Sequence, residues 1–203
     1  MAFKKIKQGT LLAPVPAVLV STGHMDNGVV KDNLITIAWA GTVCSDPPMV
    51  SISIRKERHS YHQVMESGEY VIHLVGEGQL KATDYCGVKS GRNVDKFADC
   101  NLTRTKAEGM DYAPAVEECP LYLSCKVKHM MDLGSHTMFI AEIVGMGVQD
   151  YLIEENGRIN LAKANLVAYA HGTYRKLGEA LGFFGHSVAS KETLERRMRE
   201  LRQ

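Results

Sequence analysis

The chain has 203 residues, of which 45% are hydrophobic, so it is long enough and apolar enough to bury a substantial core. Charged residues make up 23%, and the formal net charge of +1 gives no overall attraction to nucleic acid or to an anionic membrane surface. The composition therefore favours small molecules or proteins as partners.

The N-terminal sequence MAFKKIKQGT precedes an apolar run, Leu11 to Val20, that is interrupted by Pro14 and Pro16. This run has neither the hydrophobic core nor the small-residue cleavage site of a signal peptide, and no other stretch is apolar enough to span a bilayer. The cysteines are odd in number and irregularly spaced, at Cys44, Cys86, Cys100, Cys119 and Cys125. Such cysteines fit free thiols in a reducing compartment, so we expect a cytoplasmic protein without a membrane segment.

Short β-rich segments bounded by Gly, Pro, Asn and Asp dominate the rest of the chain. They are Ala17 to Ser21, Leu34 to Trp39, Met49 to Ile54, Tyr70 to Val75, Leu121 to His129 and Thr137 to Val148. Their spacing predicts a barrel or a sandwich. Since we find no internal repeat and no low-complexity linker, we expect residues 1–203 to form a single domain.

Helical patterns are few and short. One covers Tyr61 to Ser67, with Gly68 placed to end it, and another covers Glu77 to Tyr85. Leu194, Met198 and Leu201 lie on one helical face, so residues 190–203 are predicted to form an amphipathic helix with Ser190 as a possible N-cap. These helices would decorate a barrel.

A β-hairpin is predicted around Asp132-Leu133-Gly134-Ser135, because this tetrapeptide has turn chemistry and both flanks carry β-formers. His136 would then lie at the mouth of the hairpin.

Motifs of other protein classes are incomplete. Gly76-Glu77-Gly78 and Gly145-Met146-Gly147 lack the third glycine of a dinucleotide fingerprint, and Lys89-Ser90-Gly91-Arg92 lacks the Gly-Lys-Ser/Thr order of a phosphate loop. A zinc site would have to use Cys119, Cys125 and His129, whose spacing is weak for zinc, so we expect no metal.

The most informative stretch runs from Lys31 to Gly41 and on through Cys44-Ser45-Asp46-Pro47-Pro48 to Arg55. Its small residues would let a flat heterocycle approach the backbone amides, beside the aromatic surface of the only tryptophan, Trp39. Strand alternation places Leu34, Thr36 and Ala38 on one face and Asn33, Ile35, Ile37 and Trp39 on the other. Taken alone, Trp39 is more simply explained as a residue of a barrel core.

Two further segments carry groups suited to phosphate. Arg55-Lys56-Glu57-Arg58-His59-Ser60-Tyr61 combines two guanidinium groups, a hydroxyl and the N–H groups at the start of a helix. Asp84 to Phe97 mixes glycines, a hydroxyl and cations in the same way. The alternatives are a solvated charged loop for the first segment and a surface turn with a short helix for the second.

The order of these segments resembles the flavoredoxin branch of the flavin reductase family, the FMN-binding split barrels. The resemblance rests on NLITIAWAGTVCSDPPMVSISIRKERHSY, GEYVIHL, DYCGVKSGRNVDKF, GSHTMFIAEI and YAHGTY, and it extends from about Pro14 to Tyr174. It implies a mainly β fold, a split β-barrel of Greek-key type with short peripheral helices and a C-terminal helix. It also implies a homodimer that binds one FMN per subunit noncovalently near the subunit interface.

The resemblance further implies which residues bind FMN. Along the isoalloxazine ring and the ribityl chain would lie Asn33, Leu34, Thr36 and Trp39. Around the phosphate would lie Arg55, Arg58, Ser60 and Tyr61. Closing over the cofactor would be Ser90, Gly91 and Lys96, and near the flavin His136 and Tyr169. His73 stands where the family usually has Asn, and Cys86 lies beside the site; neither is assigned a role.

The function implied by the resemblance is that of an FMN-dependent oxidoreductase, which takes electrons from NAD(P)H or from a redox protein. Because the flavin ring itself exchanges hydride and electrons, no catalytic side chain is expected. A positive charge on His136 or Lys96 near the pyrimidine end would stabilise the negative charge of the reduced ring. Two alternatives remain: an FMN-carrying electron-transfer protein without direct NAD(P)H activity, and a flavin- or heme-binding protein without catalysis.

Overall fold

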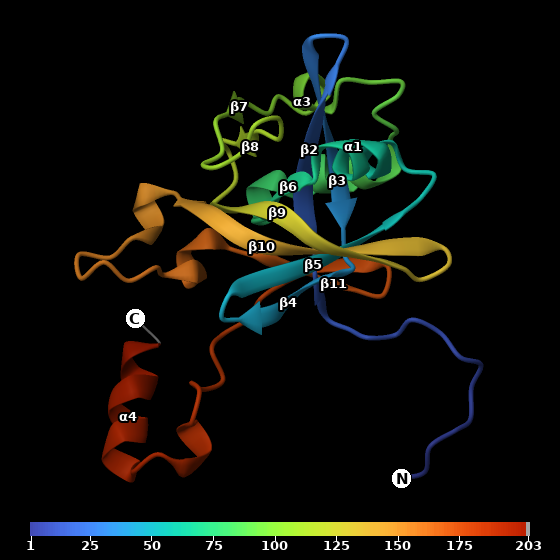
Figure 1. Ribbon diagram of the computed structural model, residues 1–203. Helices are drawn as coiled ribbons and strands as arrows, with labels where there is room; N and C mark the ends of the chain where they lie inside the picture. The colour runs from blue at the N-terminus through green and yellow to red at the C-terminus, as the bar shows by residue number, and fades with distance from the viewer. Residues whose placement is uncertain (202–203) are drawn as a thin grey trace.

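The computed structural model describes residues 1–201, which form a curled antiparallel sheet with helices beside it and two chain ends that leave it (Figure 1). The large sheet has seven strands in the order β3-β2-β6-β9-β10-β5-β4, and neighbouring strands are antiparallel. Their bounds are β2 Val18–Asp26, β3 Val29–Ile37, β4 Ala40–Ser45, β5 Pro48–Arg55, β6 Glu69–Leu74, β9 Leu121–Asp132 and β10 His136–Val148.

The sheet curls until strands from its two ends meet near Trp39. The chain bends at residues 38–39, between β3 and β4, and the N–H of Ser53 in β5 donates to the carbonyl of Trp39 at 2.9 Å. The curled sheet encloses a buried apolar cluster around Ile52, Tyr70 and Phe139. The result is a barrel that is only partly closed, with an opening beside the end of β3.

Three helices lie beside this barrel, α1 His59–Ser67, α2 Leu80–Val88 and the short α3 Lys96–Asp99. A fourth helix, α4 Lys191–Glu200, lies apart from it (Figure 1). Gly68 ends α1 in the left-handed conformation, with φ of 66°, which glycine adopts without a steric penalty. Beside β3, α2 and α3 enclose a second buried cluster that includes Leu34, Cys86 and Phe97.

Two smaller sheets complete the fold. One joins β1 Val15–Pro16, β11 Val167–Ala170 and β12 Thr173–Lys176, and the other joins β7 Arg104–Thr105 to β8 Ala115–Val116. Between β11 and β12 the chain reverses at His171 and Gly172, which both have positive φ, as a tight two-residue hairpin requires. The turn sets Tyr169 opposite Tyr174, with ring centroids 5.6 Å apart.

The strands expected from the sequence are all present, and the differences lie at their ends. The strand expected at Leu34 to Trp39 begins at Val29 and stops at Ile37, because the chain bends there to enter β4. The helix expected from Tyr61 begins at His59, and the pattern from Glu77 to Tyr85 is a 3-10 turn followed by α2. The turn after Asp132 is confirmed by Gly134, whose φ is 87°.

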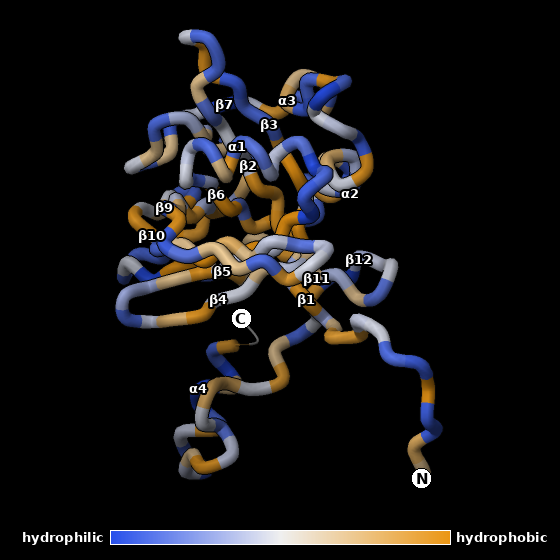
Figure 2. Tube along the Cα trace, turned by 45° about the vertical axis from the view of Figure 1, so that its right-hand side comes forward, coloured by the Kyte–Doolittle hydropathy of each residue, from blue (hydrophilic) through white to orange (hydrophobic). Residues whose placement is uncertain are grey.

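Both chain ends extend away from the barrel (Figures 1 and 2). Residues 1–13 contain neither helix nor strand, and residues 177–201 form an arm that ends in α4. Ser190 caps α4 as expected, since its Oγ accepts from the N–H of Thr193 at 3.2 Å, whereas the expected continuation to residues 202–203 lies outside the described residues. Among residues 1–201, no helix is long and apolar enough to cross a membrane.

Candidate functional site

Two adjoining cavities, each of about 330 Å³, lie at the opening of the barrel, between β3, the end of β5, the start of α1 and α2. We call the first the aromatic cavity, after Trp39, Tyr169 and Tyr174 in its walls. The second, the polar cavity, is lined by residues that include Asn33, Ser60, Ser90, Gly91 and Lys96. Ile35 and Arg58 line both cavities, and each volume lies in the range of small-molecule sites.

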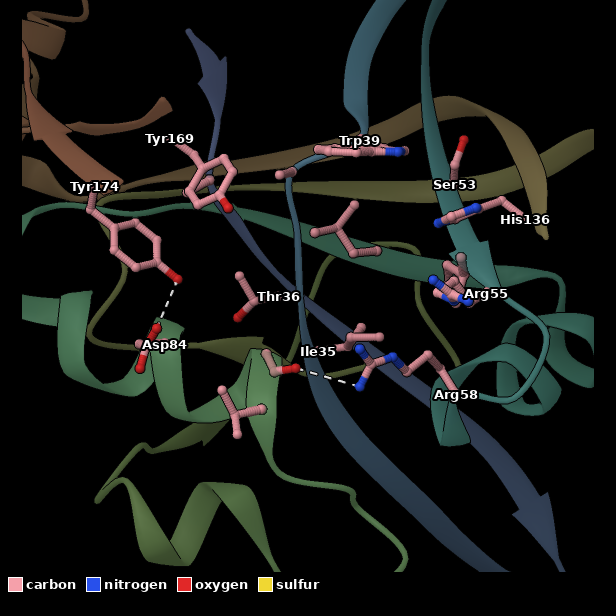
Figure 3. A pocket seen from close by; sticks show the side chains of 16 residues that line it. Ile35, Thr36, Trp39, Ser53, Arg55, Arg58, Asp84, His136, Tyr169 and Tyr174 are labelled. Carbon is pink, nitrogen blue, oxygen red and sulfur yellow. Dashed lines mark hydrogen bonds between the residues drawn. The ribbon is translucent and has the colours of Figure 1, made fainter. Parts of the chain in front are cut away.

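The aromatic cavity has two chemically different sides (Figure 3). On one side the hydroxyl of Tyr174 donates to Oδ1 of Asp84 at 3.2 Å, and Tyr169 lies next to it. Burial, together with the nearby Asp84 carboxylate, raises the pKa of Tyr174 to about 12. Tyr174 therefore keeps its proton at neutral pH, and its ring forms a fixed aromatic wall.

The opposite side of the aromatic cavity carries Arg55, Arg58 and His136 (Figure 3). The guanidinium of Arg55 is balanced by Glu57, whose Oε1 lies 2.6 Å from Nε. Arg58 differs, because its Nη1 donates only to the carbonyl of Gly87, at 3.5 Å, and within residues 1–201 it has no carboxylate at ion-pair distance. Its charge is available to an anion at the junction of the two cavities.

A buried hydrogen-bond chain shapes the floor of the polar cavity. Nδ2 of Asn33 donates to Oγ of Ser60 at 2.8 Å, and the hydroxyl of Thr22 lies 3.1 Å from the same Oγ and 2.6 Å from Oε1 of Gln63. These four side chains are almost completely buried. Their partners fix the rotamers of Asn33 and Ser60, so the polar atoms that face the cavity are held in place.

Lys96 supplies a buried positive charge to the polar cavity. Its residue is 3% exposed, and Nζ donates to the carbonyls of Leu34 at 2.6 Å and Cys86 at 2.9 Å. In the described part of the chain, no carboxylate lies at ion-pair distance from Nζ, and burial lowers the pKa of Lys96. An ammonium group with three donors and two neutral acceptors retains one donor and an uncompensated charge, which favours an anionic ligand.

Gly91 brings the loop before α3 directly onto Asn33. A Cβ atom at this position would lie 2.1 Å from Oδ1 of Asn33, well inside van der Waals contact. Only glycine fits there, so the backbone of the loop itself forms part of the cavity wall.

The structure brings most of the predicted site residues together. Those that line the two cavities are Asn33, Thr36, Trp39, Arg55, Arg58, Ser60, Ser90, Gly91, Lys96, His136 and Tyr169. His136 lines the aromatic cavity, whereas Lys96 lines the polar cavity, so the two residues would lie near different parts of a ligand that fills both cavities.

Leu34 and Tyr61 are the predicted residues that the structure does not place in either cavity. The side chain of Leu34 is fully buried in the second apolar cluster, and only its carbonyl faces the site, where it accepts from Lys96. Tyr61 packs against the first cluster, with its ring centroid 5.9 Å from that of Phe139. Strand and helix periodicity turn both side chains toward apolar cores.

Sequence reasoning missed Asp84 and Tyr174. The signal was present in Tyr169-Ala170-His171-Gly172-Thr173-Tyr174, because a two-residue turn at His171 and Gly172 sets the two tyrosines opposite each other. The contact of Tyr174 with Asp84 joins segments 90 residues apart and leaves no local pattern.

Comparison with known proteins finds relatives that match most of the chain. The family described as flavin reductase like domain matches residues 11–178. The solved structure of flavoredoxin from Desulfovibrio vulgaris (Miyazaki F) is 32% identical, with a TM-score of 0.81, and the match covers 90% of this chain and 97% of that one. FMN reductase (NADH) RutF of Pseudomonas syringae is 28% identical over 146 residues, which cover 66% of this chain and 79% of the relative.

A further relative is a high molecular weight rubredoxin of Moorella thermoacetica, 28% identical over 141 residues. The match covers 68% of this chain and 57% of the relative, so the chain spans little more than half of that protein.

Proposed function

The chain belongs to the flavin reductase like family and has its split-barrel fold, and on this basis we propose that it is an oxidoreductase that binds FMN at the two cavities. One observation carries the proposal: a cavity with aromatic walls adjoins a cavity that contains a buried cation, which has no carboxylate partner among residues 1–201. FMN has a matching shape and charge, since a flat ring is joined through a polar chain to a phosphate.

The residues present fit this cofactor. Lys96 and Arg58 would bind the phosphate, and the hydroxyls of Ser60 and Ser90 would add hydrogen bonds in the polar cavity. Trp39 and Tyr169 would contact the ring in the aromatic cavity. When bound, FMN supplies the exchange of hydride and electrons.

The residues of the chain would hold and orient the bound FMN. Thr36 is fixed by a hydrogen bond from its hydroxyl to the carbonyl of Thr83, which ties β3 to α2 along the cavity. The hairpin that carries Tyr169 and Tyr174 forms one side of the cavity. Arg55, Arg58 and His136 lie on the opposite side, where the guanidinium charge of Arg58 favours a ligand that gains negative charge on reduction.

For the electron donor, we propose NADH, NADPH or a redox protein. The Pseudomonas relative is named an NADH-dependent FMN reductase, which supports a nicotinamide donor. The names flavoredoxin and high molecular weight rubredoxin support the second candidate, an electron carrier that exchanges electrons with another redox protein and does not oxidise NAD(P)H.

The C-terminal arm, residues 177–201, also supports a homodimer. Leu181 and Phe184 are 94% and 104% exposed, and Val188 is 87% exposed, which is unfavourable for apolar side chains in water. A second copy of the chain that packs against these side chains would remove them from water.

The five cysteines of the chain are all free thiols, which supports a reducing compartment such as the cytoplasm.

The test is a titration of the purified chain with FMN, followed by steady-state assays with NADH and NADPH. We expect a visible flavin spectrum that persists through gel filtration and bleaches with dithionite. Turnover of NADH or NADPH would support the reductase. Rapid reduction by a flavoprotein or an iron–sulfur protein, without that turnover, would support the carrier. If FMN does not bind, the proposal is wrong.

A further inference from the structure

Cys86 and Cys100 lie together beside the polar cavity. Cys86 belongs to the last turns of α2, Cys100 directly follows α3, and both belong to the second apolar cluster. Their thiols are close enough that each alters the titration of the other.

Neighbouring residues hold these two segments against each other at two points. The hydroxyl of Tyr85 donates to Oδ2 of Asp99 at 2.5 Å, one residue before each cysteine. On the other side, Nζ of Lys96 donates to the carbonyl of Cys86 at 2.9 Å. The two cysteines therefore stay neighbours as long as α2 and α3 keep their places.

The pair connects the polar cavity to a separate cavity on the outer surface. Cys86 lines the polar cavity, whereas Cys100 is half-buried and lines an outer cavity of about 340 Å³ together with Tyr85 and Asp99. Cys119 belongs to the same apolar cluster but is only 4% exposed and lines neither cavity. A small oxidant can reach the pair through the outer cavity, at Cys100.

We propose that Cys86 and Cys100 form a redox-active thiol pair, which a peroxide entering the outer cavity converts to a disulfide, and that this disulfide weakens the binding of FMN in the polar cavity. The thiolate of Cys100 attacks one peroxide oxygen, the O–O bond breaks, and the product is a sulfenic acid. The sulfur of Cys86 then attacks the sulfur of Cys100, the S–O bond breaks, and water leaves. In total, the two thiols lose two protons and two electrons, and hydrogen peroxide takes up both and is reduced to two molecules of water.

The environment of the pair makes this reaction slow at neutral pH and faster at alkaline pH. Burial raises the pKa of Cys86 to about 12, and burial together with the nearby Asp99 carboxylate raises the pKa of Cys100, while Lys96 and Lys81 act in the opposite direction on Cys100. Because the thiolate is the nucleophile, the rate rises with pH.

The effect on FMN follows from Lys96. Its ammonium group is bonded to the carbonyl of Cys86, so a disulfide that draws Cys86 and Cys100 together displaces the cation proposed to bind the phosphate. The weaker binding of FMN rests on the proposed function, whereas formation of the disulfide does not.

The first experiment treats the full chain, without FMN, with hydrogen peroxide at pH 7 and pH 9, blocks the remaining thiols and maps non-reduced peptides by mass spectrometry. We expect a peptide pair joined through Cys86 and Cys100, formed faster at pH 9, abolished in Cys100→Ser and retained in Cys119→Ala. A disulfide between Cys86 and Cys119, or no disulfide, overturns the proposal.

The second experiment measures FMN affinity by fluorescence before and after oxidation. We expect the dissociation constant to rise about tenfold on oxidation of the wild-type chain, to recover on reduction, and to stay unchanged in Cys100→Ser. Equal affinities of both wild-type forms overturn control by the disulfide. If neither form binds FMN, the proposed function fails and the control of FMN with it, while the peptide map still decides whether the pair is redox-active.

Discussion

Lys96 is the residue on which the proposed phosphate site depends most directly. Replacing it by Met keeps most of the apolar stem and removes the charge, so we expect FMN affinity to fall at least about tenfold, given that hydrogen bonds to charged groups contribute roughly 1.5–3 kcal/mol. Calorimetric titration measures the change. The matched control is Lys106→Met, an exposed lysine outside both cavities, which should bind FMN as the wild type does. Equal affinities for the two variants would remove Lys96 from the site.

His73 is a second buried titratable residue, but its role is structural. The N–H of Val116 donates to Nε2 at 2.9 Å, so Nδ1 carries the hydrogen and donates to the carbonyl of Leu19 at 3.1 Å. Burial lowers the pKa of His73 to about 4 from an ordinary 6.5. At pH values between about 4 and 6.5, the unfolded chain binds a proton at this histidine and the folded chain does not. The free energy of unfolding therefore falls by roughly 3 kcal/mol as the pH drops from above 6.5 toward 4.

Urea unfolding between pH 7.5 and pH 4.5 tests this dependence. The wild type should lose stability more steeply than His73→Asn, which cannot bind the proton. Parallel pH profiles for the two proteins would show that His73 contributes nothing to the loss.

At the scale of elements, Glu69 joins the start of β6 to the loop before β8. Its fully buried carboxylate accepts from the N–H groups of Asp111, Tyr112 and Ala113, at 3.2, 2.6 and 2.8 Å, and pairs with Nζ of Lys126 at 2.5 Å. Glu69→Gln puts an amide NH₂ among these donors and leaves Lys126 without its buried partner. We expect a loss of about 3 kcal/mol in the free energy of unfolding.

Asp111→Asn is the control, because its carboxylate pairs with the same lysine at 2.9 Å but is 70% exposed. Denaturant unfolding should show a change of less than about 1 kcal/mol for this variant. A similar small change in Glu69→Gln would mean that the loop is held by other contacts.

The elements also show where sequence reasoning succeeds and where it stops. Local patterns sufficed for the long strands and for the end of α1, because period-two alternation and Gly68 act within a few residues. They did not predict β4 or the short strands β1, β11 and β12. The strand β1 has its partner β11 far along the chain, whereas β4 and β12 pair with their neighbours in sequence, β5 and β11. In the site, the placement of Leu34 depends on which face of β3 meets the helices, and that is a tertiary contact.

At the scale of the whole molecule, the C-terminal arm should decide the oligomeric state. If Leu181 and Phe184 are covered by a second copy, the double variant Leu181→Asp, Phe184→Asp should sediment as a monomer where the wild type sediments as a dimer. Circular dichroism should show that the barrel stays folded. Val29→Asp, at the tip of the β2–β3 hairpin away from both arms (Figure 1), should remain dimeric. A monomeric wild type would refute the dimer.

The contact between Gly91 and Asn33 has a consequence for related sequences. Because no side chain fits at position 91 while an amide occupies position 33, the two positions are not free to vary independently. Homologues with alanine or serine at the first position should carry a smaller residue at the second, so that paired substitutions across an alignment would record this packing as covariation.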